Sequence, residues 1–309
     1  MSLPRIFVVG ATGAQGGAVA RALLRNRYAV NVLVRDPASA ASLALKSQGA
    51  SIFEGDWDNV PALEAAAEGC TGLFLNVYPQ FEDLGGEVRH ARNILAASKR
   101  AGINQVVYSS ATGVNQYETV YDVDPEGFFG NYFRSKRTIE EEVQNGDFGT
   151  WTILRGVVFM TNYLLPSSTF MFPELSAEGR FITAYSPDTK LFLLDPEDIG
   201  GFGFAAFSNP KMFGGKGIDV AADMVGVQQM MKAMERVSGK RIEVIFRTEE
   251  EIEAQKDSDP RIMGQLLMRK TLTWVRLEEV KEWGVPLRSF EQFLEKEKDN
   301  LQRSIGGTA

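Results

Sequence analysis

Two side chains in this sequence have the types and the spacing for acid–base chemistry. Tyr132 and Lys136 stand four residues apart, so on a helix they share one face. A tyrosine with its ordinary pKa of about 10 transfers protons poorly at neutral pH until a nearby cation lowers that pKa. Ser109 or Ser110 supplies a third polar group, because open parallel sheets place ligand sites after their strands. The alternative role for Tyr132 is packing at the start of a helix.

The composition removes other chemistries from consideration. Among 309 residues there is one histidine, His90, and one cysteine, Cys70, which argues against a zinc cluster, a multi-histidine metal site, a Ser-His-Asp relay and an internal disulfide. We expect both residues to serve packing or to lie at the surface. The net charge of -7 argues against a nucleic-acid partner. Catalysis therefore falls to Tyr, Lys, Ser, Asp, Glu or a bound cofactor.

A glycine-rich turn follows the first apolar run. The spacing is GxxGxxG, and an alanine-rich helix and a second strand follow it. Glycine permits the tight bend and the close approach of a pyrophosphate, which the N-terminus of the helix then binds. The alternative is a structural turn without a ligand. We interpret the turn as a nucleotide site, formed by Gly10, Thr12, Gly13, Ala14, Gln15 and Gly16.

The end of the second strand predicts the choice of cofactor. Arg35 stands where a 2′-phosphate of NADP would lie, and a guanidinium suits phosphate. If Asp36 faced the ribose instead, the cofactor would be NAD. Asp56 follows the third strand, where its carboxylate would either accept from the adenine amino group or cap the next helix.

Alternating strand and helix signals position these residues. The pattern predicts an α/β protein with a doubly wound parallel sheet. Residues 115–130 break the rhythm and are interpreted as an acidic, aromatic loop before a helix over 131–144. We predict a nucleotide-binding domain over residues 1–155, to which a late strand near 217–221 returns, and a smaller α+β domain over 156–309. The expected strands are 6–9, 30–34, 51–54, 72–77, 105–109 and 150–155.

These motifs together resemble the NmrA-like family, an atypical branch of the short-chain dehydrogenase/reductase superfamily. The likeness spans nearly the whole chain and rests on Gly10–Gly17, Val34–Pro37, Gly55-Asp56, Val107–Ser110, Leu154–Gly156 with Phe159 and Asn162, Asp195–Gly200 and Phe290–Leu294. The family implies a Rossmann domain, a smaller substrate-side domain and NADP(H) binding. Some members resemble redox-sensing regulators, and others resemble reductases of small carbonyl or unsaturated compounds.

The resemblance also implies roles for individual residues. In the superfamily the tyrosine protonates a carbonyl oxygen as hydride arrives, the lysine binds the nicotinamide ribose, and a serine polarises the carbonyl. Tyr132, Lys136 and Ser109 take these catalytic roles here. Further cofactor contacts are expected from Asn76, Val77, Lys136 and Phe159. Ser109 and Tyr132 are separated by more residues than is typical, so the loop before Tyr132 either displaces this tyrosine or covers the site.

Aromatic residues gather where the substrate would bind. We expect a fairly apolar pocket lined by Tyr78, Phe81, Phe159, Asn162 and Tyr163, although core packing would also explain these rings. The favoured hypothesis is an NADPH-dependent reductase of a small carbonyl or unsaturated compound. The alternative is an NADP(H)-binding sensor with a regulatory protein partner, and the third hypothesis is a binding module without nucleotide. We expect a cytoplasmic monomer or homodimer without a metal or a membrane segment.

Overall fold

The computed structural model describes residues 4–79, 82–121, 123–270 and 274–306. The chain divides into two compact units. Unit 1 comprises Met1–Tyr117, Val123–Gly156 and Pro196–Asp219, and unit 2 comprises Glu118–Asp122, Val157–Asp195 and Val220–Ala309. The chain thus leaves unit 1 after Gly156 and comes back to it at Pro196. This division differs from the expected one, in which only a late strand returns.

Unit 1 is built on a parallel sheet, which confirms the predicted α/β fold. Within the described residues it has seven strands in the order β10-β6-β5-β4-β1-β2-β3. The pairs β1–β2, β2–β3, β1–β4, β4–β5 and β5–β6 are all parallel. The order reverses between β1 and β4, and this switch point is where open α/β sheets bind ligands. The strands are β1 (Arg5–Val8), β2 (Ala29–Val34), β3 (Ser51–Glu54), β4 (Gly72–Leu75), β5 (Gln105–Ala111), β6 (Thr150–Gly156) and β10 (Lys216–Val220).

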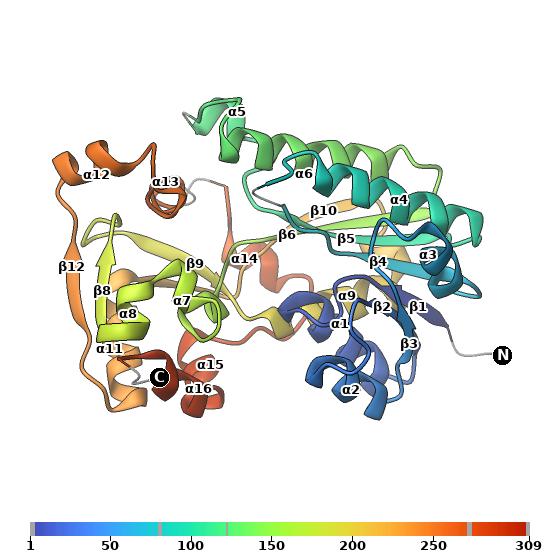
Figure 1. Cartoon of the computed structure of the whole chain (residues 1–309), viewed down its shortest axis with the longest axis horizontal. Helices are drawn as coiled ribbons and strands as arrows, with labels where there is room; N and C mark the ends of the chain where they lie inside the picture. Colours follow the sequence, from blue (N-terminus) through green and yellow to red (C-terminus); the bar gives the residue numbers. More distant parts are fainter. Residues whose placement is uncertain (1–3, 80–81, 122, 271–273, 307–309) are drawn as a thin grey trace. The chain divides into compact units, whose positions relative to one another are not determined.

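Helices cover both faces of this sheet (Figure 1). One face carries α3 (Val60–Ala67), α4 (Gly86–Arg100) and α6 (Phe128–Gln144), and the other carries α1 (Ala14–Arg25), α2 (Ala40–Ser47) and α9 (Pro196–Ser208). The short helix α10 (Pro210–Phe213) follows α9 in unit 1, and the short helix α5 (Tyr117–Val120), which follows β5, lies mostly in the segment Glu118–Asp122 of unit 2. The strands are continuous apolar runs because both of their faces are buried, as Phe7, Leu73 and Val106 show.

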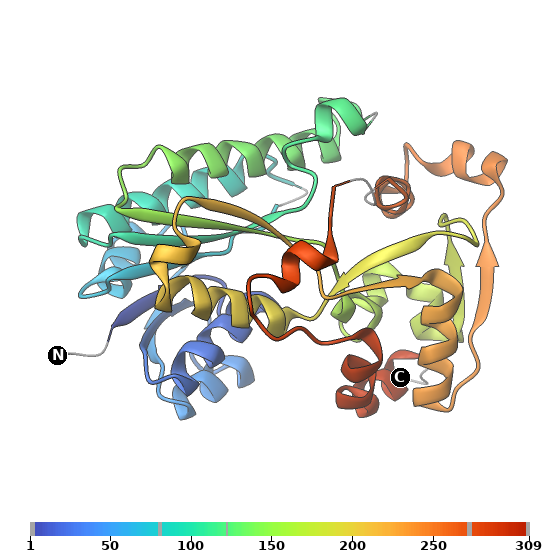
Figure 2. The ribbon, with the colours of Figure 1, turned by 180° about the vertical axis from the view of Figure 1, so that it is seen from behind.

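The returning segment packs closely on the first helix. A Cβ on Gly200 of α9 would lie only 2.7 Å from the Ala18 carbonyl oxygen, so this position requires glycine. Glu197 at the start of α9 accepts from Arg21 of α1 at 2.5 Å. Figure 2 shows the segment from behind, with α9 against the sheet and β10 beside β6. The predicted returning strand is thus β10, and two helices precede it in unit 1.

Most predicted elements agree with the structure to within a few residues, and two differ for local reasons. The first helix begins at Ala14, so the last residues of the glycine-rich motif, Gln15 and Gly16, already lie in the helix instead of preceding it. The predicted loop over 115–130 contains α5 and the first residues of α6.

Unit 2 mixes short strands and helices around its own core. Its sheets have the strand orders β11-β9-β7 and β12-β8, with β9–β11 antiparallel and β7–β9 and β8–β12 parallel. Its strands are β7 (Val158–Phe159), β8 (Arg180–Thr183), β9 (Lys190–Leu194), β11 (Asp223–Gly226) and β12 (Glu243–Phe246). Its helices are η1 (Met160–Tyr163), α7 (Ser168–Met171), α8 (Pro173–Glu178), α11 (Val227–Ser238), α12 (Glu249–Gln255), α13 (Pro260–Met268), α14 (Leu277–Lys281), α15 (Phe290–Lys296) and α16 (Lys298–Ser304). In the described part of the chain, none of the helices is long and apolar enough to cross a membrane.

Candidate functional site

The glycine turn after β1 has a backbone that only glycine fits at two positions. Gly10 has φ +68°, in the left-handed region, and a Cβ there would lie 3.0 Å from the Asn76 carbonyl oxygen. A Cβ on Gly16 would lie 2.4 Å from the Gly10 carbonyl oxygen. Gly13 caps α1 without a side chain, and the first turn of α1 carries no acidic residue. The positive end of the α1 dipole is therefore left for an anionic ligand.

A cavity of about 580 Å³ opens at this turn, at the carboxyl ends of β1 to β4. It brings together most of the residues that the sequence assigned to a cofactor. Gly16, Val77, Lys136 and Phe159 are absent from its described walls. The walls include Gly10, Thr12, Gly13, Ala14, Gln15, Arg35, Asp56, Asn76 and Tyr78.

The two charged residues after β2 have different environments. Arg35 is exposed and lines the cavity. The Asp36 carboxylate instead accepts a hydrogen bond from the Ala38 backbone N–H at 2.8 Å, in the turn that leads to α2. Arg35 is thus the charged side chain that borders the cavity at this strand end, as the sequence favoured.

Asp56 fixes the turn that leads to α3 and borders the cavity, but it is not the N-cap of that helix. Its Oδ1 accepts from the backbone N–H groups of Asp58 and Asn59 at 3.0 and 2.9 Å, which fixes the turn before α3. Asp56 also lines the cavity. The cap of α3 is Asn59, whose side chain accepts from the Ala62 backbone N–H at 3.2 Å, and the adenine contact of Asp56 stays a prediction.

The same cavity is also lined by Trp57, Asp58 and Arg89, to which the sequence gave no role, and by His90, which was expected to serve packing or to lie at the surface. The Trp57 ring lies 5.1 Å from the Tyr78 ring and 5.5 Å from the His90 ring. Arg89 pairs with Asp58 at 3.2 Å and with Asp83 at 2.8 Å, and its hydrogen bond lowers the pKa of Asp58. The available signal was position, since Trp57 and Asp58 follow β3 and Arg89 lies near the start of α4, the helix after β4.

Ser109 connects the end of β5 to the glycine turn. Its hydroxyl is almost fully buried and donates to Gln15 Oε1 at 2.5 Å. Ser110, the other serine considered, donates to Glu140 Oε1 at 2.6 Å. Glu140 in turn binds Arg155 through two hydrogen bonds of 2.9 and 2.6 Å, so Arg155 has the acidic structural partner that was expected. Of the two serines, Ser109 is therefore the one that contacts the glycine turn, and Ser110 contacts the buried Glu140–Arg155 pair instead.

Lys136 lies between the end of β4 and Tyr132. Its Nζ donates to the Val77 carbonyl oxygen at 3.1 Å and lies 5.9 Å from the centre of the Tyr132 ring. The same ammonium is 2.6 Å from Glu87 Oε1 on α4, and both side chains are buried. The structure therefore brings Lys136, Tyr132 and Val77 together and adds a carboxylate that the sequence did not identify.

The remaining residues of the predicted pocket belong mainly to unit 2. Phe159 lies in β7 and Asn162 in η1. Tyr163 is fully buried and stacks on Phe172 at 4.9 Å in the hydrophobic core of unit 2, which is the packing role weighed against a pocket wall. Phe81 lies outside the described residues.

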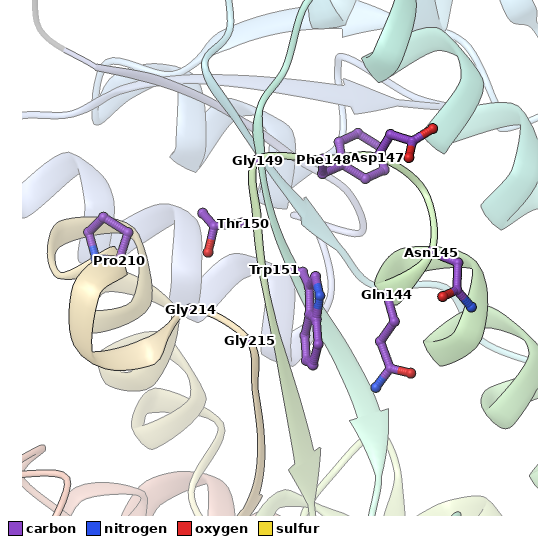
Figure 3. Close-up of a pocket in the computed structure, with 10 residues that line it drawn as sticks. All are labelled: Gln144, Asn145, Asp147, Phe148, Gly149, Thr150, Trp151, Pro210, Gly214 and Gly215. Atoms are coloured by element: carbon purple, nitrogen blue, oxygen red, sulfur yellow. The ribbon is translucent and has the colours of Figure 1, made fainter.

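A second cavity of unit 1, of about 630 Å³, lies at the amino ends of β6 and β10 (Figure 3). It surrounds the start of β6, where Thr150 and Trp151 stand, and the loop at Gly214 and Gly215. Parallel sheets place their ligand sites at the carboxyl ends of strands, not at this edge. We therefore assign no function to this cavity. Within the described residues, no cluster of His, Cys, Asp and Glu could hold a metal ion.

The NmrA-like family profile matches residues 3–268. The chain belongs to the NmrA-like family. Among curated relatives, the NmrA-like family domain-containing oxidoreductase FrzB of a Cladobotryum species is 30% identical over 256 residues, which cover 76% of this chain and 74% of FrzB. The relative malD of Malbranchea aurantiaca, also named an oxidoreductase, is 28% identical over 252 residues, 76% of this chain and 73% of its own.

Solved structures with low sequence identity share this fold. NmrA, described as a negative transcriptional regulator and solved with NADP, superposes with a TM-score of 0.70 at 19% identity, covering 96% of this chain and 95% of NmrA. The NADPH-dependent quinone oxidoreductase QOR2 of Escherichia coli, solved with NADPH, gives a TM-score of 0.69 at 20% identity, covering 94% of this chain and 99% of QOR2.

Proposed function

We propose that this protein is an NADPH-dependent oxidoreductase that reduces a small, fairly apolar carbonyl or unsaturated compound. The observation that carries the proposal is the placement of Lys136 and Tyr132 at the end of β4, in the unit whose glycine turn and Arg35 form the cavity. The names of the oxidoreductase relatives and of QOR2 support the same reaction class.

The described residues fit a dinucleotide. The backbone at Gly10 and Gly16 leaves no room for a Cβ, and the uncapped start of α1 suits a pyrophosphate. Arg35 offers a guanidinium to a 2′-phosphate, and the cavity continues past Asp56 to Trp57. When bound, NADPH supplies the hydride. Val77 and Lys136 stand where the second half of a dinucleotide crosses the carboxyl ends of β4 and β5.

The chain's own residues then handle the proton and the substrate oxygen. Tyr132 donates its phenolic proton to the oxygen that becomes a hydroxyl, and Lys136 stabilises the phenolate that remains. Ser109 exchanges its hydrogen bond with Gln15 for one to the substrate oxygen, which polarises the carbonyl. For an enone or quinone the same proton goes to the oxygen of the enol or hydroquinone.

The test is a titration followed by a substrate screen. NADPH binding is measured by cofactor fluorescence, and NADPH oxidation is followed optically with aliphatic and aromatic aldehydes, ketones, enones and quinones. We expect tight NADPH binding and oxidation with at least one class. Absence of NADPH binding would overturn the proposal.

A regulatory role is the second candidate, because NmrA itself is described as a negative transcriptional regulator. In that case NADP(H) binds without turnover, and the cofactor changes association with a protein partner. Tight binding with no oxidation across the substrate panel would favour this candidate over the enzyme.

A further inference from the structure

The partner of Lys136 is a carboxylate for which the proposed reaction has no role. The side chains of Lys136 and Glu87 are 6% and 1% exposed, and Nζ lies 2.6 Å from Oε1. Neither carboxylate oxygen of Glu87 has a hydrogen-bond partner among the residues that the structure describes, so the ion pair with Lys136 is the contact that offsets its burial. A buried carboxylate requires a compensating charge, and Lys136 provides it. The two charges therefore form one neutral unit.

Glu140 cannot substitute for Glu87. It stands one helical turn after Lys136 on α6, but it accepts from Ser110 and from two nitrogens of Arg155. Its charge is thus already balanced by Arg155. Removal of Glu87 would leave the Lys136 ammonium as an uncompensated positive charge at the end of β4.

The sheet order shows which part of a dinucleotide would meet this charge. A dinucleotide crosses the switch point, with one nucleotide over β1, β2 and β3 and the other over β4, β5 and β6. Arg35, at the end of β2, belongs to the adenosine half. Lys136 bonds the carbonyl of Val77, just after β4, and therefore belongs to the nicotinamide half.

We propose that Glu87 is a positioning residue that holds Lys136 at Val77 and cancels its charge, so that the site does not repel an oxidised nicotinamide ring. The ring of NADP⁺ carries a positive charge, and the ring of NADPH carries none. A lone ammonium would disfavour the oxidised cofactor, whereas the Lys136–Glu87 pair does not. The inference rests on the proposed function, because it requires nicotinamide binding.

The test compares the affinities for the two redox forms by calorimetry. In Glu87→Gln the shape is kept and the negative charge is lost. We expect the dissociation constant for NADP⁺, divided by that for NADPH, to rise about tenfold, which corresponds to about 1.4 kcal/mol. This energy is smaller than the Coulomb repulsion between two unit charges at close range in such a site. The double variant Glu87→Gln with Lys136→Met should return to the wild-type ratio. Glu141→Gln, which removes an exposed carboxylate from α6, is the matched control and should leave the ratio unchanged.

Each outcome has one meaning. If Glu87→Gln weakens both cofactors by the same factor, Glu87 only supports the fold and the inference is wrong. If Glu87→Gln does not fold, Lys136→Met gives the mirror test, in which the lone carboxylate should shift the ratio toward NADP⁺. No shift there also overturns the inference. If the wild-type protein binds neither cofactor, the proposed function itself fails, and this result is distinct from an unchanged ratio.

Discussion

Lys136 forms its ion pair with Glu87 on α4 and not with Glu140, one turn further along its own helix. Tyr132, Lys136 and Glu140 lie along one face of α6, but the two charged residues of this face contact different elements. Lys136 is held against β4 and α4, and Glu140 is held against β5 and β6 through Ser110 and Arg155. Two buried ion pairs thus lie beside each other under the carboxyl ends of the central strands.

The first prediction concerns the stability of the Lys136–Glu87 pair. Lys136→Met should destabilise the protein by about 3–5 kcal/mol, because it leaves the buried Glu87 carboxylate uncompensated. The double variant with Glu87→Gln should recover most of that loss, since no buried charge remains. Urea unfolding measures both. A loss in the double variant equal to the sum of the losses in Lys136→Met and Glu87→Gln would show that the two residues are not coupled.

The sequence predicted the residues whose neighbours are local and missed the one whose partner is distant. The glycine turn, Arg35 and Asp56 follow directly after parallel strands. Their common position at the carboxyl ends of these strands could therefore be inferred from the order of strands and helices in the sequence. Glu87 could not be found in this way. An i,i+4 pattern pairs Lys136 with Glu140, and only the packing of α4 against α6 brings Glu87 to the ammonium.

The return of α9 to unit 1 was missed for a similar reason. The segment Pro196–Ser208 is apolar on most of its surface, which indicates burial but not the element against which it packs. Gly200 and Gly203 were the available signal, since a Cβ on either would crowd Ala18 or Val19 of α1. Small residues three apart on a helix indicate a close helix neighbour without identifying it.

The second prediction concerns cofactor choice. Arg35→Ala should weaken NADPH binding by roughly ten- to a hundred-fold and leave NADH binding nearly unchanged, because a hydrogen bond to a charged group contributes about 1.5–3 kcal/mol. Arg35 is exposed, so the fold should be unaffected. Fluorescence titration measures both affinities, with Lys99→Ala as a control that removes a positive charge outside the cavity. Equal weakening of both cofactors would remove Arg35 from the 2′-phosphate.

The third prediction separates binding from folding within the glycine turn. Gly13→Val should abolish cofactor binding, because the branched side chain would occupy the approach of the pyrophosphate to the start of α1. The loss of stability should be small, because φ is negative at Gly13 and a Cβ there would lie 3.3 Å from the Gly10 carbonyl oxygen. Gly16→Ala should destabilise the apo fold by about 1–3 kcal/mol, because its Cβ would be 2.4 Å from that oxygen. Thermal melts with and without NADPH separate the two effects. A normal NADPH-induced shift in Gly13→Val would contradict the phosphate assignment.

The fourth prediction is a dependence of stability on pH. Burial raises the pKa of the Cys70 thiol to about 12, from 9.0. Because the pKa of Cys70 is raised in the folded state, the buried neutral thiol makes its full contribution to the free energy of unfolding below about pH 9. That contribution is lost as the pH rises toward 12. The stability advantage of wild type over Cys70→Ala should therefore fall by up to about 1.4 kcal/mol per pH unit in this window. Urea unfolding at several pH values checks this, and a constant difference would contradict it.

The last prediction distinguishes the enzyme from the sensor. Tyr132→Phe keeps the ring that packs against Phe133 and lies beside Lys136, and it removes only the hydroxyl. NADPH affinity should therefore hold, while turnover of any substrate found in the screen should fall about 10²–10⁴-fold, the usual contribution of a general acid. Phe129→Leu changes the packing around Tyr132 without touching the proton, and its turnover should stay well above that of Tyr132→Phe. Wild-type turnover by Tyr132→Phe would assign the proton donor elsewhere.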